Sequence, residues 1–362
     1  FTSIVYSFKA KNYLLACSCK RLHFGAAVST IEDVAKLAGV STATVSRVVN
    51  NNGNVTTRTG QRVLVAMKEL DYHPNKFARG LAGNLADGIG VVIQNFTELY
   101  YGMVLREIER VTQKHNLQIT VAGANRSARD ELNAIEFLRR QHYNVVILTN
   151  SGLSASVLLK IAEQGIKFVH LGRYIPELAE HCIYLDDMQG ADLAMNYLFA
   201  QGHKRIAHIA FPELQAHTDL RLRGYRRASE KLVFKPADFD QTSAFAATKR
   251  LLERKEKFTA MFVSTDLMAI GAYKALQEAG LRIPEDVSMV GYDDIDLASF
   301  LYPPLTTIKQ PIQEMSMAAA QLAIHYLKGQ GESAKEVMHR FSPSLVIRDS
   351  VRSLEKKKSS VS

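Results

Sequence analysis

The chain has 362 residues, of which 47% are apolar and 22% charged, and its formal net charge is +9. This length allows two or three structural units, and no apolar run approaches the ~20 residues that a membrane-spanning helix needs. The sequence therefore predicts a soluble globular protein and excludes a membrane span. The three cysteines, Cys17, Cys19 and Cys182, suit neither a disulfide framework nor a zinc site, which favours the reducing cytoplasm.

The positive charge is concentrated near the N-terminus. Residues 1–82 contain eleven Lys or Arg against four Asp or Glu, whereas the rest of the chain contains 34 against 32. A polyanion would be attracted to this basic end. Within it, the longest apolar run of residues 1–29, YLLAC, is shorter than the about 7–15 apolar residues of a signal peptide. We expect a disordered or artefactual extension there, with a signal peptide as the alternative.

The stretch TIEDVAKLAGVSTATVSRVVN predicts two short helices separated by a tight turn. Thr30 is placed to cap the first helix, with Asp33 at the third helical position, close to the capping-box pattern. Gly39 ends this helix, and Ser41 caps a second one that runs to about Val49. The second helix has valines on one face and short polar side chains on another. We expect the polar face to be exposed to solvent.

A third helix is predicted from about residue 58 to residue 70, with Val63, Leu64, Met67 and Leu70 closing a three-helix core. The second helix would then present its polar face to solvent, and the small side chains at its start would let it enter a major groove about 12 Å wide. This is the arrangement of a helix-turn-helix DNA-binding unit. A plain helical hairpin is the alternative, but such a face would usually carry Lys and Glu.

Within the predicted DNA-binding unit, residues divide by the part of the duplex that they would contact. Arg47 suits paired hydrogen bonds to guanine, and with it Thr42 and Ala43 are the expected base readers. Hydroxyl and amide side chains are expected at phosphates, where they position the protein without reading sequence. This set is Thr30, Ser41, Thr44, Asn50, Thr56 and Thr59. For Ser41 and Thr56, helix capping alone is an equally good explanation.

The segment DYHPNKFARGLAG, residues 71–83, contains a conditional helix. Pro74 ends the preceding helical pattern, and the two turns that follow are too short to be stable alone. Basic side chains there would meet phosphates, and a leucine could wedge between base steps in the minor groove. The expected contacts are Asn75, Lys76, Ala78, Arg79 and Leu81. A solvated linker is the alternative.

From residue 86 onward, short apolar runs alternate with amphipathic segments, which predicts a doubly wound parallel sheet with helices on both faces. A break near Asp187 divides the runs between two similar lobes around a cleft. Ligands of such sheets bind at the carboxyl ends of the strands. The eight predicted strands are GIGVVI, LQITVAG, NVVILTN, IKFVHLG, RIAHIAF, FTAMFVST, VSMVGYDD and LTTIKQ.

The helix-turn-helix stretch, the later YHPNKFARGLA and the α/β body together resemble the LacI/GalR family of bacterial transcription regulators, over about residues 30–350. Within that family, the N-terminal pattern is nearest to the galactose and β-glucoside repressors. The resemblance implies a homodimer whose paired headpieces read a pseudo-palindromic operator and whose paired hinge helices open its centre. It also implies a periplasmic-binding-protein-like body whose chain crosses between lobes near Asp187, near Pro311 and in SPSLVIRDS.

The resemblance and the residue pattern together predict the domain organisation. Residues 1–29 form the extension, 30–73 the all-α headpiece, 74–85 the hinge helix or linker, 86–350 the two-lobed effector-binding and dimerisation domain, and 351–362 a flexible tail. The tail lacks a heptad run, so a dimer is expected rather than a tetramer.

Effector candidates come from two sources. Polar residues at predicted strand ends give Gln94, Asn95, Thr149 and Asn150 in the first lobe, and Thr265, Asp266, Asp293 and Asp294 in the second. Arg173 also follows a predicted strand end, and it lies after the strand that the resemblance assigns to the effector lobe. The resemblance implies that Arg221 and Asp293 grip the effector. Thr265 and Asp266 stand where the family usually has Asn-Asp, a departure that removes one amide group. Asp266 is equally expected to cap the following helix.

Other functions are less favoured by the sequence. The GIG at Gly88 precedes its strand and lacks a third glycine, and P-loop, nucleophile-elbow and zinc-helix motifs are absent, so no cofactor or metal is expected. An enzyme would need a converging nucleophile, base and orienting group, and none can be assembled. A secreted sugar-binding protein would lack the headpiece. We therefore expect a dimeric repressor of a sugar-utilisation operon, released by a small sugar, with a corepressor-dependent regulator as the alternative.

Overall fold

The computed structural model describes residues 29–49, 55–72, 88–211, 218–228, 233–234, 238–329 and 337–354. The chain divides into two compact units, Phe1–Asn84 and Leu85–Ser362. Among the described residues, none of the helices combines the length and apolar character needed to cross a membrane.

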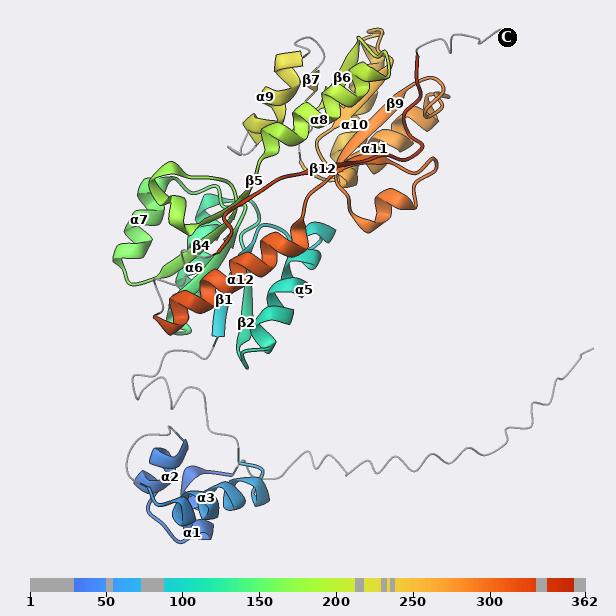
Figure 1. Cartoon of the computed structure of the whole chain (residues 1–362). Helices are drawn as coiled ribbons and strands as arrows, with labels where there is room; N and C mark the ends of the chain where they lie inside the picture. Colours follow the sequence, from blue (N-terminus) through green and yellow to red (C-terminus); the bar gives the residue numbers. More distant parts are fainter. Residues whose placement is uncertain are drawn as a thin grey trace, which may run out of the picture. The chain divides into compact units, whose positions relative to one another are not determined.

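The described residues of the first unit form a three-helix bundle, the headpiece, drawn in blue in Figure 1. Its core is small, and the buried side chains that form it are Val34, Ala35, Ala38, Val45, Val63 and Ala66. The prediction that Leu64 closes this core is wrong, because Leu64 is 57% exposed and Val63 and Ala66 fill its place. The helices are α1 (Ile31–Ala38), α2 (Thr42–Val49) and α3 (Thr57–Glu69).

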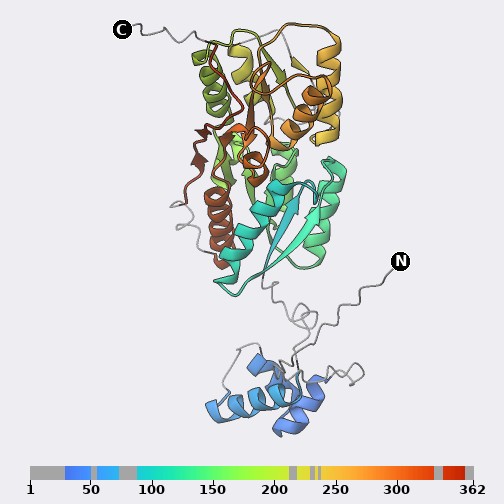
Figure 2. The same ribbon diagram turned by 90° about the vertical axis from the view of Figure 1, so that its right-hand side faces the viewer.

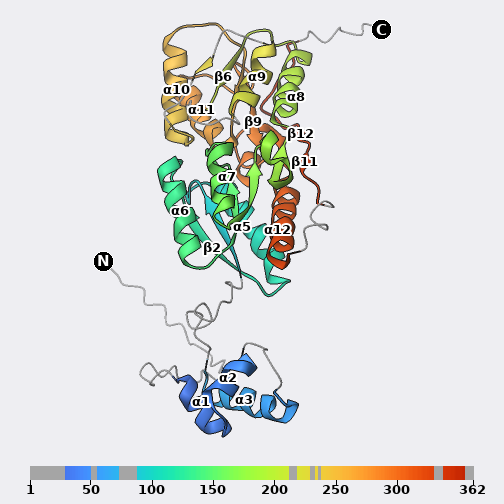
Figure 3. The same cartoon turned by 90° about the vertical axis from the view of Figure 1, so that its left-hand side faces the viewer.

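The second unit consists of two lobes, each built on a six-stranded sheet with helices on both faces (Figures 1–3). Lobe 1 contains β1 (Gly88–Ile93), β2 (Gln118–Gly123), β3 (Val145–Thr149), β4 (Lys167–Gly172), β5 (Cys182–Leu185), β11 (Arg340–Phe341), α5 (Leu99–Gln113), α6 (Ala128–Arg140), α7 (Ala155–Glu163), η1 (Pro176–His181) and α12 (Ile312–Lys328). Lobe 2 contains β6 (Ile206–Ile209), β7 (Val233–Phe234), β8 (Ala260–Val263), β9 (Ser288–Asp293), β10 (Thr306–Lys309), β12 (Ser344–Val346), α8 (Asp187–Ala200), α9 (Thr218–Ala228), α10 (Gln241–Glu253), α11 (Asp266–Glu278) and η2 (Asp296–Ser299).

The strand order is β11-β5-β4-β3-β1-β2 in lobe 1 and β12-β10-β9-β8-β6-β7 in lobe 2. All neighbouring strands are parallel except β10 and β12. The described chain passes between lobes after β5, after β10 and between β11 and β12, as the resemblance implied. These crossings lie side by side and join the lobes without fusing their sheets (Figure 1).

Alternation along the central strands explains the two-sided packing of each lobe. In β3, Val145 and Ile147 belong to the core under α5 and α12, whereas Val146 and Leu148 face α6 and α7. Successive side chains of a strand point to opposite faces, so a strand that is apolar throughout needs a helical layer on each side. Figure 3 shows α6 and α12 on opposite sides of lobe 1.

The predicted fold class is confirmed, and the eight predicted strands are present as β1 to β4, β6 and β8 to β10. Four strands were not predicted. Three of them, β7, β11 and β12, have only two or three residues, too few to show an alternating pattern. The fourth, β5, lies at the first lobe crossing, where the sequence predicted only a break.

Candidate DNA-binding headpiece and effector cavity

The exposed face of α2 is the candidate DNA-reading surface. Val45 is fully buried against α1 and α3, which fixes the rotation of the helix. The side chains of Thr42, Ala43 and Arg47, the three predicted base readers, are exposed. Because the buried valine turns these three residues outward together, one short helical face offers a hydroxyl, a methyl group and a guanidinium to a partner.

Three predicted phosphate contacts serve as helix caps. Thr30 and Asp33 form a complete capping box, in which the Asp33 carboxylate accepts from the Thr30 amide at 2.8 Å. Ser41 Oγ accepts from the Thr44 amide at 3.2 Å at the start of α2, and Thr56 caps α3 in the same way. The capping interpretations are thus confirmed, while contacts of these residues and Thr59 with phosphate stay predictions.

The end of α1 is held by an arginine that the sequence did not single out. Gly39 adopts a left-handed conformation with φ of 63°, as expected of a glycine that ends a helix. The guanidinium of Arg62, from α3, donates to the carbonyl of Ala38. The last carbonyls of a helix lack partners within it, so this contact fixes the turn before α2.

Of the predicted headpiece and hinge contacts, Asn50, Asn75, Lys76, Ala78, Arg79 and Leu81 lie outside the described residues.

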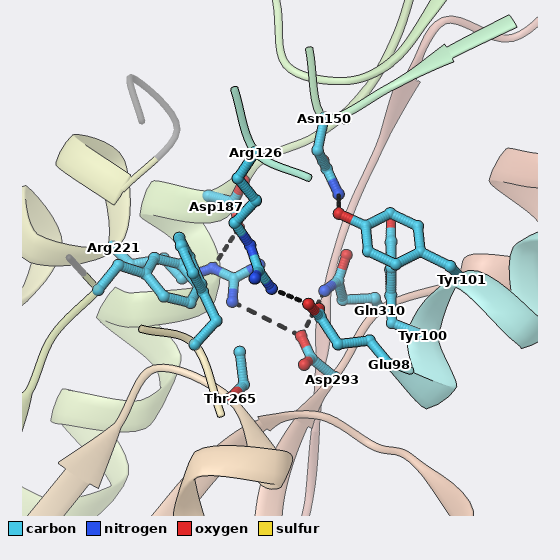
Figure 4. A pocket seen from close by; sticks show the side chains of 13 residues that line it. Glu98, Tyr100, Tyr101, Arg126, Asn150, Asp187, Arg221, Thr265, Asp293 and Gln310 are labelled. Carbon is cyan, nitrogen blue, oxygen red and sulfur yellow. Dashed lines mark hydrogen bonds and ion pairs between the residues drawn. The ribbon is translucent and has the colours of Figure 1, made fainter. Parts of the chain in front are cut away.

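A cavity lies between the lobes, at the carboxyl ends of both sheets (Figure 4). Its volume is about 50 Å³. Charged groups and aromatic rings from both lobes line it. The lining residues are Glu98, Tyr100, Tyr101, Arg126, Asn150, Gly172, Asp187, Phe211, Arg221, Phe239, Thr265, Asp293 and Gln310.

Arg221, on α9, is the central cation of this cavity (Figure 4). Its Nε donates to Asp187 Oδ1 at 2.7 Å, and its Nη1 donates to the Ser264 carbonyl at 2.7 Å and lies 3.5 Å from Asp293 Oδ1. The guanidinium also lies 3.6 Å from the centroid of the Tyr292 ring. Desolvation is the largest single influence and lowers the pKa of Arg221, but Asp187, Tyr292 and Asp293 together raise it overall, so the group stays charged.

Asp293, at the end of β9, is a buried carboxylate of the cavity. Burial raises its pKa to about 7, although the Arg221 charge and a 2.5 Å hydrogen bond from Gln310 oppose the shift. A carboxylate that needs a cation and an amide to remain partly ionised is poised to accept hydrogen bonds from a ligand that enters with hydroxyl donors.

The wall that lobe 1 contributes contains Tyr100, Tyr101 and Asn150. The Asn150 amide is 3.5 Å from the Tyr101 hydroxyl, and the asparagine packs against Gly172. At Gly172, where φ is 133°, an added Cβ would lie 2.1 Å from Asn150 Oδ1. Glycine is therefore needed there for the asparagine to reach the cavity.

Several predicted effector residues do not line this cavity. Gln94 donates to the Thr149 carbonyl at 3.1 Å, and the Thr149 hydroxyl donates to the Val92 carbonyl, so both are engaged inside lobe 1. Asn95 accepts from the amide and hydroxyl of Thr97 in its own loop. The guanidinium of Arg173 donates to the Leu153 carbonyl.

Asp266 is buried in lobe 2 and outside the cavity lining. Its Oδ1 accepts from the Thr307 hydroxyl at 2.6 Å, and its Oδ2 accepts from the Ile295 amide at 3.1 Å. The prediction that Asp266 caps α11 is wrong, because the Thr265 hydroxyl accepts from the Met268 amide and is the cap. The departure from Asn-Asp thus gives the helix a good cap and leaves a threonine in the cavity wall.

Sequence reasoning missed most of the aromatic and charged lining. Phe211 and Gln310 end the predicted strands RIAHIAF and LTTIKQ, so the rule that ligands bind at strand ends could have identified them. Asp187 stands at the predicted break. Arg126 and Phe239 lie in loops, where no spacing in the sequence indicates that they meet.

Both units of the chain match known protein families. Residues 30–75 match the model of bacterial regulatory proteins of the lacI family, and residues 195–351 match the periplasmic binding protein-like domain. The HTH-type transcriptional regulator GalS of Salmonella typhimurium is 34% identical over 89% of this chain and 96% of its own length.

Solved structures give the same result. The Lac repressor dimer bound to operator and the anti-inducer ONPF is similar with a TM-score of 0.77 and 29% identity, over 90% of this chain and all of that one. The complex of the transcriptional regulator CelR with cellobiose has a TM-score of 0.65 and 31% identity, over 89% and 99%. With the helix-turn-helix headpiece and the two-lobed body both matched along their lengths, the chain belongs to the lacI family of bacterial transcriptional regulators.

Proposed function

We propose that the protein represses a sugar-utilisation operon by binding a pseudo-palindromic operator as a homodimer, and that an uncharged small sugar bound between the lobes releases it. The observation that carries the proposal is the presence in one chain of an outward α2 face and a polar interlobe cavity. The Lac repressor dimer was solved bound to operator, and CelR was solved with cellobiose, which supports both halves of the proposal.

The headpiece would read DNA through Thr42, Ala43 and Arg47 in the major groove. Arginine can form two hydrogen bonds with guanine, and a methyl group can contact thymine. Thr30, Ser41, Thr44, Thr56 and Thr59 lie at the starts of the helices, where the helix dipole favours phosphate. The hinge contacts from Asn75 to Leu81 complete the proposed interface.

The charges of the cavity favour an uncharged ligand. Three carboxylates, Glu98, Asp187 and Asp293, face two guanidiniums, Arg126 and Arg221. Every guanidinium is already paired with carboxylates, so a phosphate or an acid would enter without a free cation and next to negative charge. Hydroxyl groups can donate to the carboxylates and accept from the guanidiniums, and the aromatic rings can cover a sugar face. Arg221, Thr265 and Asp293 are the proposed ligand contacts retained from the sequence analysis.

The proposal includes no catalysis and places the protein in the bacterial cytoplasm, where the DNA lies. GalS is a transcriptional regulator, and the carboxylates of the cavity are committed to arginine and amide partners. Release by the sugar requires that it bind the closed and open lobe states unequally. In corepression, ligand binding would strengthen operator binding instead of weakening it. The resemblance to sugar regulators favours induction.

Selection from fragments of the source genome tests the DNA half of the proposal. The full chain should enrich fragments that share a palindrome with two half-sites, and Arg47→Ala should lose that enrichment. Adding D-galactose, a β-glucoside, a sugar phosphate or a purine during selection then tests the ligand half. Loss of enrichment with an uncharged sugar is the expected result, whereas enrichment that requires the purine would establish corepression.

Effector affinity should rise with pH through about 7. Ligand hydroxyls bond to ionised Asp293, whose pKa burial raises to about 7, so below this pH binding must expel a proton. Each pH unit below 7 is then expected to cost up to about tenfold in affinity. Calorimetric titration between about pH 5.5 and pH 8.5 measures this slope. Asp293→Asn should give a flat profile, and a wild-type profile equally flat would remove Asp293 from the ligand contacts.

A further inference from the structure

One edge of the cavity carries an ion-pair network that joins the two lobes. Arg126 follows β2 in lobe 1, and its Nη1 is 3.0 Å from Oδ1 of Asp238, which precedes α10 in lobe 2. The same guanidinium pairs with Glu98 of lobe 1 (Figure 4) and lies 4.2 Å from the centroid of the Phe239 ring in lobe 2. The side chain of Arg126 is 15% exposed and that of Asp238 is 52% exposed, so the network runs from the cavity wall to solvent.

The backbone at this point is held in an uncommon conformation. Asn125 and Arg126 are successive left-handed residues, with φ of 46° and 54°. Asparagine tolerates this region, but a long side chain such as arginine adopts it only where surrounding contacts hold it there. A hydrogen bond from the Ser127 amide to the Ala124 carbonyl at 2.9 Å closes the turn, and the contacts of Arg126 with Glu98, Asp238 and Phe239 add to that restraint.

Aromatic rings connect this network to the ligand-binding arginine. Phe239 packs on Phe211 with ring centroids 4.8 Å apart, and the Phe211 centroid is 5.1 Å from the Arg221 guanidinium. A sugar that contacts Arg221 must therefore enter beside the rings that support Arg126. Phe211 and Phe239 therefore form a continuous contact between the interlobe network and the arginine of the cavity.

In this arrangement of the lobes the cavity is too small to hold a sugar. Its volume is about 50 Å³, against roughly 300–1,000 Å³ for the usual small-molecule site. We propose that Arg126 and Asp238 form an interlobe latch that holds the cleft closed, and that the effector binds only after this latch opens. The proposal rests on the proposed function only for the identity of the ligand, because the latch is a property of the ligand-free chain.

The solvent exposure of Asp238 limits how far the ion pair can shift the equilibrium between open and closed lobes. An ion pair with one half-exposed partner shifts an equilibrium by up to about fivefold. The apparent dissociation constant of the effector is the intrinsic one divided by the open fraction, when that fraction is small. Asp238→Asn should therefore raise the open fraction and the effector association rate about two- to fivefold. Asp238 does not line the cavity, so the ligand contacts stay intact.

Asp240→Asn is the matched control. Asp240 caps α10 by accepting from the Ser243 amide at 2.6 Å, and asparagine caps equally well. This variant removes the same charge two residues away, keeps the helix cap and leaves the Arg126–Asp238 pair in place.

Hydrogen–deuterium exchange on the ligand-free full chain tests the latch directly. In Asp238→Asn, the amides of residues 98–101 and 264–268, which flank the cavity from the two lobes, should exchange about two- to fivefold faster. Asp240→Asn should have a smaller effect, because the charge of Asp240 acts on Arg126 less strongly than that of Asp238. Arg126→Gln should reproduce the increase, and the double variant should add nothing to either single change, because the pair acts as a unit. Unchanged exchange in Asp238→Asn, or an equal increase in Asp240→Asn, would overturn the latch.

The association of D-galactose and of methyl β-D-glucoside, followed by stopped flow, separates the latch from the proposed function. Faster exchange in Asp238→Asn without binding of either sugar would support the latch and count against these effectors. Binding and operator release with unchanged exchange would overturn the latch and support the proposed function. For whichever sugar binds, an association rate that rises about two- to fivefold in Asp238→Asn is the expected result, and an unchanged rate would contradict the latch.

Discussion

Replacing Arg221 with alanine should abolish the response of operator binding to effector while leaving ligand-free operator binding intact. The guanidinium supplies charged hydrogen bonds on the floor of the cavity, each worth about 1.5–3 kcal/mol, so the effector affinity should fall by at least about 100-fold. Stability should fall as well. Asp187 would lose the 2.7 Å bond from Nε, and removing one partner of a buried pair costs about 3–5 kcal/mol.

Matched variants distinguish loss of ligand contact from loss of the fold. Arg221→Lys keeps the charge but lacks the planar fork, so it should recover most of the stability and little of the effector response. Arg223→Ala removes an exposed arginine from the same helix and should behave like the wild type. For all three variants, thermal unfolding measures the stability and sugar titration measures the effector response. An Arg221→Ala protein that still releases operator on addition of sugar would move the ligand site elsewhere.

Replacing Arg47 with alanine should remove most of the discrimination between operator and random DNA. A paired contact between arginine and guanine contributes about 1–3 kcal/mol of discrimination, so operator affinity should fall about 5- to 150-fold in each affected half-site. Random duplex offers no defined partner and is held by phosphate contacts, so affinity for it should change little. Competition titrations at fixed salt measure the ratio of the two affinities.

Arg58→Ala provides the control for charge. Arg58 is exposed on α3 and carries the same charge within the same headpiece. Its loss should weaken operator and random DNA by similar factors, because a contact with phosphate does not depend on sequence. If Arg47→Ala also weakened both duplexes equally, Arg47 would be a phosphate contact and the proposed recognition face of α2 would be wrong.

The fold was predictable where the sequence pattern is long and regular. The eight strands with apolar runs were identified, because a strand covered on both faces is apolar at successive positions. Short edge strands such as β11 form only because a lobe crossing brings them beside a partner. The headpiece shows the same limit: Leu64 has the spacing of a core residue, yet smaller side chains on neighbouring turns fill the small core of the bundle.

The cavity was predictable only in part, for a physical reason. Asp293 and Thr265 end strands, and Arg221 was identified by its resemblance to effector-binding positions. Gln94 and Thr149 also end strands, but they face the interior of lobe 1 and bond to backbone carbonyls. Which of two adjacent polar residues turns into a cleft depends on the rotation of the strand end. Pairs such as Arg126 and Asp238 depend on how the two lobes meet.

Whether a sugar bound between the lobes controls operator binding can be measured in one titration. A fluorescent duplex carrying the palindrome upstream of the neighbouring genes is bound by the full chain, and D-galactose or a β-glucoside is then added. One sugar should weaken operator binding about 5- to 150-fold, and operator should weaken binding of that sugar by the same factor. Tight operator binding that is unaffected by a sugar shown to occupy the cavity would contradict this prediction.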